Sequence, residues 1–170
     1  MRLFIAINFD ENMVDALASM QDELMESGVR GNFTRPENMH MTLAFIGEYD
    51  DPEGIEEIMR NVPLRSFTIK LSECRPFKDM YFAEIEENED LHNYVKRLRH
   101  ALSDNDIPFD RKKFLPHITL VRKADRGKRS GFTPEIVGDE SMRVRGISLM
   151  KSERGKHGMI YTEMAYVTAF

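Results

Sequence analysis

The chain has 170 residues, of which 41% are hydrophobic and 31% are charged, and its formal net charge is −5 at pH 7. This composition is ordinary for a globular protein and excludes a long disordered part. The negative charge argues against a broad electrostatic grip on nucleic acid, although a small cleft can still be basic locally. The length suits one domain, or two small lobes that share a sheet, so we expect a single domain over residues 1–170.

Neither a membrane segment nor a disulfide bond is expected. No apolar stretch approaches the ~20 residues that a membrane-spanning helix needs, and the apolar opening at residues 2–7 is too short for a signal-peptide core. Cys74 is the only cysteine, so it has no partner within the chain, and we expect it to be a small, semi-buried apolar residue. The sequence thus predicts a cytoplasmic protein that does not bind a membrane.

The first part of the chain predicts a strand, a helix and a second strand. Apolar residues alternate over residues 3–8, which is typical of a strand. Asp10 is a good N-cap because its carboxylate can accept hydrogen bonds from the amides of the first turn, and apolar residues then recur at helical spacing up to Gly28. The apolar and β-branched run at residues 39–46 favours a strand that ends at Gly47.

The middle of the chain predicts two further helices with two strands between them. Residues 51–62 begin with Asp-Pro, a typical helix start, and Pro63 ends this short helix. Residues 67–72 and 80–85 alternate as half-buried strands, and residues 91–102 carry the apolar stripe of an amphipathic helix.

The last part of the chain predicts three strands, namely residues 115–121, residues 142–149 with a bulge near Gly146, and residues 159–167. A basic and exposed loop is expected at residues 123–129. The glycine-containing turn at residues 155–158 would join the last two strands into a hairpin. Together with the earlier elements, these strands predict a bilobal α+β domain.

One short motif occurs twice, as His40-x-Thr42 and His117-x-Thr119, with an apolar residue between and after the two polar ones. In a strand, side chains two positions apart leave on the same face, so each copy directs an imidazole and a hydroxyl to one side. Two such strands side by side would form a cleft with two histidines and two threonines.

The motif belongs to a longer repeat. A shift of 77 positions, the distance from His40 to His117, overlays the chain on itself without a gap and places Phe4 on Tyr81 and Ala6 on Ala83. Repeats usually arise from stacking requirements, but packing alone does not explain why both copies keep histidine and threonine opposite the apolar pair. The overlaid strand–helix–strand units are approximately residues 2–47 and 79–124.

The five histidines differ in their expected roles. His92 and His100 lie off the apolar stripe of their helix and are expected in solvent, and His157 lies in a turn, either as a surface residue or on a substrate loop. His40 and His117 could be two hydrogen-bonded structural histidines, but the duplication favours a function.

Two imidazoles suit general acid–base chemistry at one phosphorus atom. The unperturbed pKa of imidazole is ~6.5, so near neutral pH one ring can be neutral while the other keeps its proton. A general acid and a general base each contribute about 10²–10⁴-fold in rate, and threonine hydroxyls can donate hydrogen bonds to the phosphate oxygens. Which histidine is the acid and which is the base stays open at this point.

A metal site is the rival explanation for paired histidines. Zinc would need three or four ligands, and the neighbours of both motifs are mainly Met, Thr, Leu, Ile and Phe, which do not supply them. The sequence also contains neither a Gly-rich phosphate loop nor a Gly-x-Ser-x-Gly motif. We therefore expect no metal ion and no cofactor.

The sequence resembles the 2H phosphoesterase superfamily, and most closely its LigT/ThpR branch, the RNA 2′,3′-cyclic phosphodiesterases. The resemblance covers nearly the whole chain and depends mainly on residues 2–7, 35–48, 116–122 and 149–152. It implies two pseudo-symmetric lobes, related by a pseudo-two-fold axis, with mainly antiparallel sheets that line a central cleft.

The resemblance also implies a metal-free enzyme that opens a terminal 2′,3′-cyclic phosphate to a 2′-phosphomonoester. By position, His40 would donate a proton to the leaving 3′ oxygen and His117 would accept a proton from water. Thr42 and Thr119 would hold the phosphate, and Arg122 would supply positive charge. In reverse, the same pair would give 2′-5′ RNA ligase activity. The implied partners are RNA ends or nucleotides that bear a 2′,3′-cyclic phosphate, bound by a monomer.

Recognition beyond the phosphate is less defined by the sequence. Lys151 stands where many family members have arginine, and a lysine offers only a point charge to a phosphate. Basic residues flank the second motif, namely Arg111, Lys112, Lys113, Lys123, Arg126, Lys128 and Arg129. They would either guide an RNA backbone electrostatically or belong to a solvated loop without a binding role. Phenylalanines that could stack a terminal base, although most are expected in the core, are Phe9, Phe33, Phe45 and Phe114.

Two other functions stay open. One is a nucleotide- or RNA-binding module that keeps the cleft without turnover. The other is a phosphodiesterase that acts on a small cyclic nucleotide.

Overall fold

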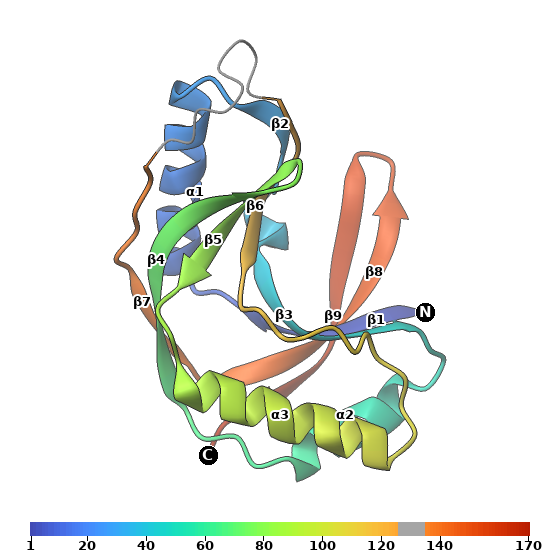
Figure 1. Cartoon of the computed structure of the whole chain (residues 1–170). Coiled ribbons are helices and arrows are strands. Elements are labelled where there is room, and N and C mark those ends of the chain that lie inside the picture. Colours follow the sequence, from blue (N-terminus) through green and yellow to red (C-terminus); the bar gives the residue numbers. More distant parts are fainter. Residues whose placement is uncertain (126–134) are drawn as a thin grey trace.

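The computed structural model of the chain describes residues 1–125 and 135–170 (Figure 1). Its strands are β1 (Arg2–Asn8), β2 (Arg30–Phe33), β3 (His40–Glu48), β4 (Phe67–Phe77), β5 (Met80–Ile85), β6 (Ile118–Asp125), β7 (Ser141–Val144), β8 (Gly146–Gly155) and β9 (Gly158–Thr168). Its helices are α1 (Glu11–Glu26), the short 3-10 helix η1 (Pro36–Asn38), α2 (Pro52–Asn61) and α3 (Glu89–Asp104).

The described strands form two antiparallel sheets. One sheet has the strand order β3-β1-β8-β9 and the other has the order β2-β6-β5-β4-β7. The β8–β9 hairpin extends beyond its sheet and stands opposite β2 and β6 (Figure 1). The expected α+β fold, with mainly antiparallel sheets, is therefore confirmed.

Helices α1 and α3 begin in the same way. Oδ1 of Asp10 accepts a hydrogen bond from the Met13 amide at 2.8 Å, and Oδ1 of Asn88 accepts one from the Leu91 amide at 3.0 Å. Each cap satisfies an amide that has no partner within its helix. Because the caps are 78 positions apart, as are the first residues of the two helices, α1 and α3 correspond residue by residue at that offset.

The two motif strands carry bulges at equivalent residues. In the pairing of β3 with β1 the register skips Leu43, and in the pairing of β6 with β5 it skips Leu120. Each skipped residue directly follows the threonine of its motif, and the two are 77 positions apart, as the repeat predicts. A β-bulge leaves one residue outside the hydrogen-bonded ladder and bends the strand, which changes where nearby side chains point.

The ungapped overlay is wrong by one residue at the first strand of each unit. Ala6 pairs with Thr42 and Phe82 pairs with Thr119, so β1 and β5 correspond at an offset of 76 rather than the 77 that placed Ala6 on Ala83. A slip of one residue exchanges the two faces of a strand. The segment between β5 and α3 is longer than that between β1 and α1, which an ungapped shift cannot represent.

Each helix of the repeat lies against the sheet of the other unit. α1 packs on β6 and β7, whereas α3 packs on β3. Figure 1 shows α1 along the five-stranded sheet and α3 below the four-stranded one. β3 and β6 contact each other but lie in different sheets, so the motif strands are neighbours without being paired in one sheet. The two units are interleaved, and neither forms a lobe from its own elements alone.

Two further local predictions are corrected by the structure. The strand expected at residues 142–149 is two strands: β7 pairs with β4 and β8 pairs with β1, so the chain passes from one sheet to the other at Arg145 instead of forming a bulge. β6 continues to Asp125, into the expected loop at residues 123–129, while residues 126–129 lie outside the described residues. The sequence did not predict β2, whose four residues are mostly exposed.

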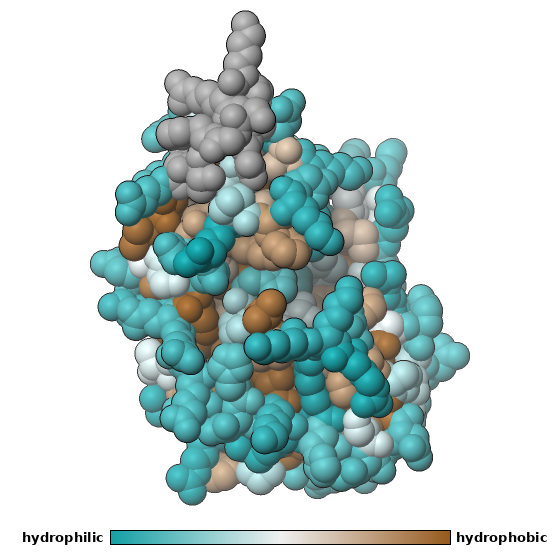
Figure 2. Space-filling model, viewed as in Figure 1, coloured by the Kyte–Doolittle hydropathy of each residue, from teal (hydrophilic) through white to brown (hydrophobic). Residues whose placement is uncertain are grey.

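The apolar residues are mainly inside. One cluster of buried apolar side chains runs through both halves of the molecule. Figure 2 shows a largely hydrophilic face on which apolar residues occupy limited areas. Cys74 is buried, more deeply than expected, and burial raises the pKa of its thiol to about 12.

Among residues 1–125 and 135–170, no helix combines the length and the apolar character that crossing a membrane requires.

Candidate active site

His40 begins β3, and both of its ring nitrogens have partners. Nδ1 lies 2.7 Å from the carbonyl oxygen of Asn38, and Nε2 lies 3.1 Å from Oγ1 of Thr42. A carbonyl oxygen can only accept, so Nδ1 carries a proton, and Nε2 bears the lone pair in the neutral ring. The ring packs against Phe4 and Tyr161, with centroid distances of 5.0 and 5.2 Å.

The charge of His40 is set by its surroundings. Burial lowers the pKa of His40 below the ordinary value of 6.5, the hydrogen bond to Asn38 opposes this shift, and the charges of Arg122 and His117 add to it. The neutral imidazole is therefore favoured in the free protein. The same interactions show that Arg122 and His117 lie within electrostatic range of His40.

His117 directly precedes β6, and its ring is held by a hydrogen bond of the same kind as that of His40. Its Nδ1 lies 2.7 Å from the carbonyl oxygen of Leu115, the residue that corresponds to Asn38 in the repeat. Its ring packs on Phe82 with centroids 4.3 Å apart and planes inclined by 31°. Nδ1 again carries the proton, so both motifs present Nε2 as the nitrogen that is available for proton transfer.

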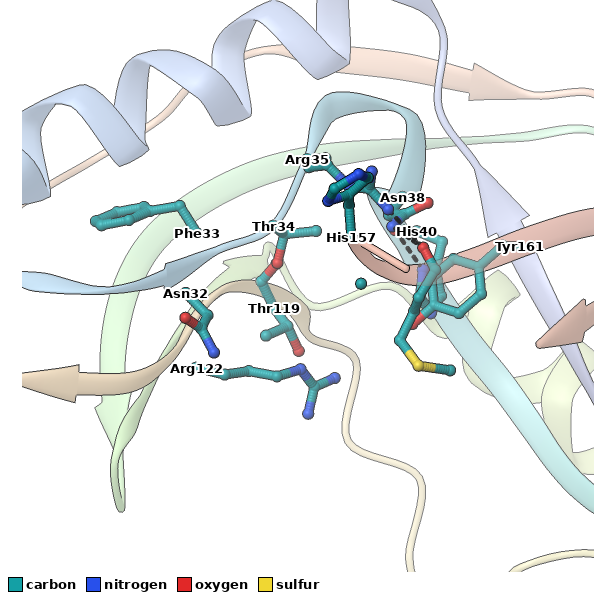
Figure 3. A pocket seen from close by; sticks show the side chains of 12 residues that line it. Asn32, Phe33, Thr34, Arg35, Asn38, His40, Thr119, Arg122, His157 and Tyr161 are labelled. Carbon is teal, nitrogen blue, oxygen red and sulfur yellow. Dashed lines mark hydrogen bonds between the residues drawn. The ribbon is translucent and has the colours of Figure 1, made fainter. Parts of the chain in front are cut away.

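A cavity of about 430 Å³ separates the two halves of the site. His40 and Tyr161 lie on one side of it, and Thr119 and Arg122 of β6 lie on the other (Figure 3). Its lining residues are Asn32, Phe33, Thr34, Arg35, Asn38, His40, Thr119, Arg122, His157, Gly158, Met159 and Tyr161. The structure therefore gathers three of the five predicted residues, His40, Thr119 and Arg122, around one cavity.

The other two predicted residues, Thr42 and His117, do not line that cavity. The hydroxyl of Thr42 contacts the ring of His40, and His117 lies within electrostatic range of His40. All five predicted residues thus belong to one region of the molecule.

The β8–β9 hairpin closes one side of the cavity and is attached to the segment that leads to His40. Nη2 of Arg35 donates to the carbonyl oxygen of Met159 at 2.6 Å, and Nδ2 of Asn38 donates to the same oxygen at 3.0 Å. Asn38 therefore holds His40 with its carbonyl group and the hairpin with its amide. His157, at the hairpin turn, lines the cavity, which favours the substrate-loop alternative over a plain surface role.

Tyr161 and Asn38 were not singled out by the sequence. Tyr161 comes from β9, outside both repeat units, and no motif surrounds it. Asn38 lies two residues before His40, where the repeat places Leu115, and both act through the backbone carbonyl, which any residue type supplies. The contact therefore has no signature in residue type, and its only regularity is the spacing of two residues between the carbonyl group and the histidine.

Of the remaining predicted residues that the structure describes, Phe33 lines the cavity and the others are not among its lining residues. Lys151 pairs with Glu153 at 2.5 Å and is not among the lining residues. Phe9, Phe45 and Phe114 are partly buried against the apolar clusters. His92 and His100 are exposed, as predicted, and so are the basic residues Arg111, Lys112, Lys113 and Lys123. Arg126, Lys128 and Arg129 lie outside the described residues.

Metal-ligating side chains are not clustered in the part of the chain that the structure describes. There, no three histidine, cysteine, aspartate or glutamate side chains come together in a group that could hold a metal ion. A metal-free reaction remains a prediction that chelation tests.

The comparison with known families decides the identity of the fold. The model of the LigT-like phosphoesterases matches residues 7–81 and 84–161 of this chain. The chain belongs to this family. The resemblance to the 2H phosphoesterases, found from the two motifs, is therefore confirmed, because the two matched segments contain one motif each.

Curated LigT-like relatives share a name. A Thermotoga maritima protein named RNA 2′,3′-cyclic phosphodiesterase is 33% identical over 132 residues, which cover 72% of this chain and 70% of that protein. A Methanothermobacter thermautotrophicus protein with the same name is 28% identical over 183 aligned positions, which cover 96% of each chain.

Solved structures have the same LigT-like fold. A Thermus thermophilus protein superimposes with a TM-score of 0.84 at 25% identity, and the match covers 99% of this chain and 97% of the Thermus thermophilus chain. E. coli LigT complexed with 3′-AMP gives a TM-score of 0.84 at 20% identity and covers 99% of this chain and 96% of its own. The expected bilobal fold is confirmed by these likenesses.

Proposed function

We propose that this protein hydrolyses the terminal 2′,3′-cyclic phosphate of RNA to a 2′-phosphomonoester without a metal ion. The observation that carries this proposal is the pair of motif histidines, each with Nδ1 bonded to a carbonyl oxygen, of which His40 lines the cavity and His117 lies within electrostatic range of His40. The names of the relatives from Thermotoga maritima and Methanothermobacter thermautotrophicus support the substrate class.

In the proposed reaction, His117 takes a proton from water as the water oxygen attacks phosphorus. The bond from phosphorus to the 3′ oxygen breaks, and His40 gives its Nε2 proton to that oxygen, which leaves the phosphate on the 2′ oxygen. Thr119 and Arg122, which line the cavity, are suited to bind the non-bridging oxygens and to stabilise the charge that develops on them. Thr42 is suited to orient the Nε2 of His40 and to share the phosphate.

A general acid must be protonated when it acts, whereas burial favours neutral His40 in the free protein. A phosphodiester anion beside the ring favours the imidazolium form and so offsets the effect of burial. In this proposal, His40 gains its proton together with the substrate. The assignment of His40 as the acid comes from the family resemblance, and pH profiles of the two histidine variants test it.

The experiment that tests the function is a panel of substrates with identification of the product. RNAs and mononucleotides that end in a 2′,3′-cyclic phosphate are incubated with the protein, with and without EDTA. We expect a 2′-phosphate product and equal rates in EDTA. A 3′-phosphate product, or loss of activity in EDTA, would contradict the proposal.

The same panel separates the alternatives. Tight binding of a nucleotide without turnover of any cyclic end would indicate a binding module. Turnover of mononucleotides alone would indicate a phosphodiesterase for small cyclic nucleotides. Turnover of the RNA ends would exclude both.

2′-5′ RNA ligation is part of the proposal, because a 5′-hydroxyl in the place of water can give its proton to the same base while the 3′ oxygen leaves with the proton of the same acid. RNA with a cyclic end, mixed with RNA that has a 5′-hydroxyl, should give a 2′-5′ linkage. We further propose that the protein acts as a cytoplasmic monomer, formed by one domain over residues 1–170. Elution from a size-exclusion column as a dimer would contradict the monomer.

A further inference from the structure

The bulged carbonyl groups of the two motif strands receive hydrogen bonds from helix side chains. Nε and Nη2 of Arg99 donate to the carbonyl oxygen of Leu43 at 3.1 and 3.0 Å. Nε2 of Gln21 donates to the carbonyl oxygen of Leu120 at 3.0 Å. A bulged residue is outside the regular ladder, so donors from elsewhere in the structure hold its backbone in place. The Leu120 oxygen also accepts a hydrogen bond from the Thr34 amide at 2.9 Å, so Gln21 shares the hold on this carbonyl with the backbone.

Gln21 and Arg99 occupy equivalent positions. Gln21 is the eleventh residue after its N-cap, Asp10, and Arg99 is the eleventh after Asn88. The bonds are nevertheless crossed between the units, because the helix of the first unit reaches the second motif and the helix of the second unit reaches the first motif. The exchange of the helices between the sheets explains how this crossing is formed.

Each of these side chains also bonds the segment that leads to the other motif. The Nε2 of Gln21 donates to the carbonyl oxygen of Thr34 at 2.8 Å, six residues before His40. The Nη1 of Arg99 donates to the carbonyl oxygen of Lys112 at 2.7 Å, five residues before His117. Each side chain therefore links the strand of one motif to the approach of the other.

The surroundings of the two side chains favour fixed positions. Gln21 is only 6% exposed, inside the apolar core, where a lost hydrogen bond would be costly. The guanidinium of Arg99 lies 5.7 and 5.6 Å from the ring centroids of Phe109 and Phe114. The rigid fork of arginine is well suited to hold two carbonyl oxygens at the same time.

We propose that Gln21 and Arg99 are positioning residues that set the spacing of the two motif histidines by holding the bulged carbonyl of the opposite motif. This inference rests on the proposed function, in which both imidazoles must act on one phosphorus atom. An error of about 1 Å in the placement of reacting groups can cost about 10²-fold in rate.

The test compares matched variants. Gln21→Met and Arg99→Gln remove the crossed bonds while keeping much of the side-chain volume. Met20→Leu changes a buried neighbour on the same helix, and Arg97→Gln changes an exposed arginine on α3 that lies on a different side. All are assayed with adenosine 2′,3′-cyclic phosphate, well below the thermal midpoint of each variant.

We expect kcat to fall about 10- to 100-fold in Gln21→Met and Arg99→Gln, with KM changed by less than about threefold. The control variants should keep kcat within about twofold of the wild type. Arg99→Lys keeps a charged donor, so its kcat should lie between that of Arg99→Gln and that of the wild type, because one amine can donate to one of the two carbonyl oxygens. A purely structural role would lower the thermal midpoint and leave kcat unchanged.

A second measurement does not depend on turnover. The imidazole nitrogen signals of His40 and His117 are recorded by NMR in protein with labelled histidine. Arg99→Gln should move the signals of His40, and Gln21→Met should move those of His117, whereas the controls should move neither. Movement confined to the histidine of the mutated unit would overturn the inference.

The two proposals can fail separately. If the wild type turns over no cyclic phosphate, the proposed function fails, and the imidazole signals alone decide the positioning role. If the wild type is active and both variants keep its kcat, the positioning role fails while the proposed function stands.

Discussion

The two histidine sites share one motif and one backbone contact but have different surroundings. In both, Nδ1 lies 2.7 Å from the carbonyl oxygen two residues earlier. The ring of His40 contacts two aromatic rings and a threonine hydroxyl, whereas His117 packs on the single ring of Phe82. Tyr161, the additional ring at His40, comes from β9, outside the repeat. The repeat supplies two proton carriers with the same backbone contact, and Tyr161, from outside the repeat, adds to the difference between their surroundings.

This difference is what a division of labour between acid and base requires. Two groups with the same pKa would not prefer opposite protonation states, and unequal surroundings separate them. Burial lowers the pKa of His40, so its protonation responds to whatever occupies the cavity. The following predictions test this asymmetry.

The largest effect is expected from removing either imidazole. His40→Ala and His117→Ala should each lower kcat by about 10²–10⁴-fold, because each loses one proton-transfer step. Turnover of a cyclic-phosphate RNA measures the loss, and circular dichroism checks that the fold survives. The exposed His92 gives the matched control, since His92→Ala should keep the activity of the wild type. Full activity in either motif variant would remove the basis of the comparison.

A smaller effect is expected at the phosphate side of the cavity. Arg122→Met should lower kcat by about 10²-fold, because the cavity loses the cation that faces the developing charge. Lys151→Met should change kcat by less than about twofold, since Lys151 pairs with Glu153 and does not line the cavity. Equal losses of kcat in both variants would show that the rate depends on positive charge in general and not on the position of Arg122 at the cavity.

The asymmetry itself can be removed at Tyr161. In Tyr161→Ala the ring of His40 is opened to water, so the pKa of His40 should rise toward 6.5, because burial is the largest cause of its depression. NMR titration of the imidazole measures this shift. Phe82→Ala changes the aromatic contact of His117 instead and should leave the pKa of His40 close to that of the wild type. An unchanged titration in Tyr161→Ala would show that other groups bury His40.

The smallest effect is expected on the stability of the fold. Because the pKa of His40 is lower in the folded protein than in the unfolded chain, the unfolded chain takes up its proton first as the pH falls. The free energy of unfolding should therefore decrease as the pH falls below about 6.5 and level off below the folded pKa. His40→Gln should lose this part of the slope in denaturant titrations between pH 5 and 8. A slope identical to that of the wild type would indicate that His40 does not couple to folding.

The sequence predicted what local patterns can encode. The alternation at the start of the chain, the cap at Asp10 and the two His-x-Thr copies predicted main elements and the candidate site, because each depends on residues close together in the chain. The helical stripe around Gln21 predicted that α1 buries a face. It did not predict that this face lies on the sheet of the other unit, because hydrophobic spacing does not identify the packing partner.

The features that the sequence missed depend on distant contacts. β2 is short and polar, and its pairing with β6 is visible only in the structure. The change of parity around Gly146 predicts an extra residue in one strand, but a single residue, Arg145, links strands of two different sheets. The glycine-containing turn predicted the β8–β9 hairpin, but no local pattern indicated that this hairpin brings Tyr161 to His40.

The exchanged helices bear on the ancestry of the chain. A polypeptide with only one strand–helix–strand unit would leave its helix without the sheet on which that helix packs. Two copies of such a polypeptide would satisfy each other, with one helix passing in each direction. The present chain has the architecture of such an intertwined homodimer within one polypeptide, so each half can differ in sequence from the other.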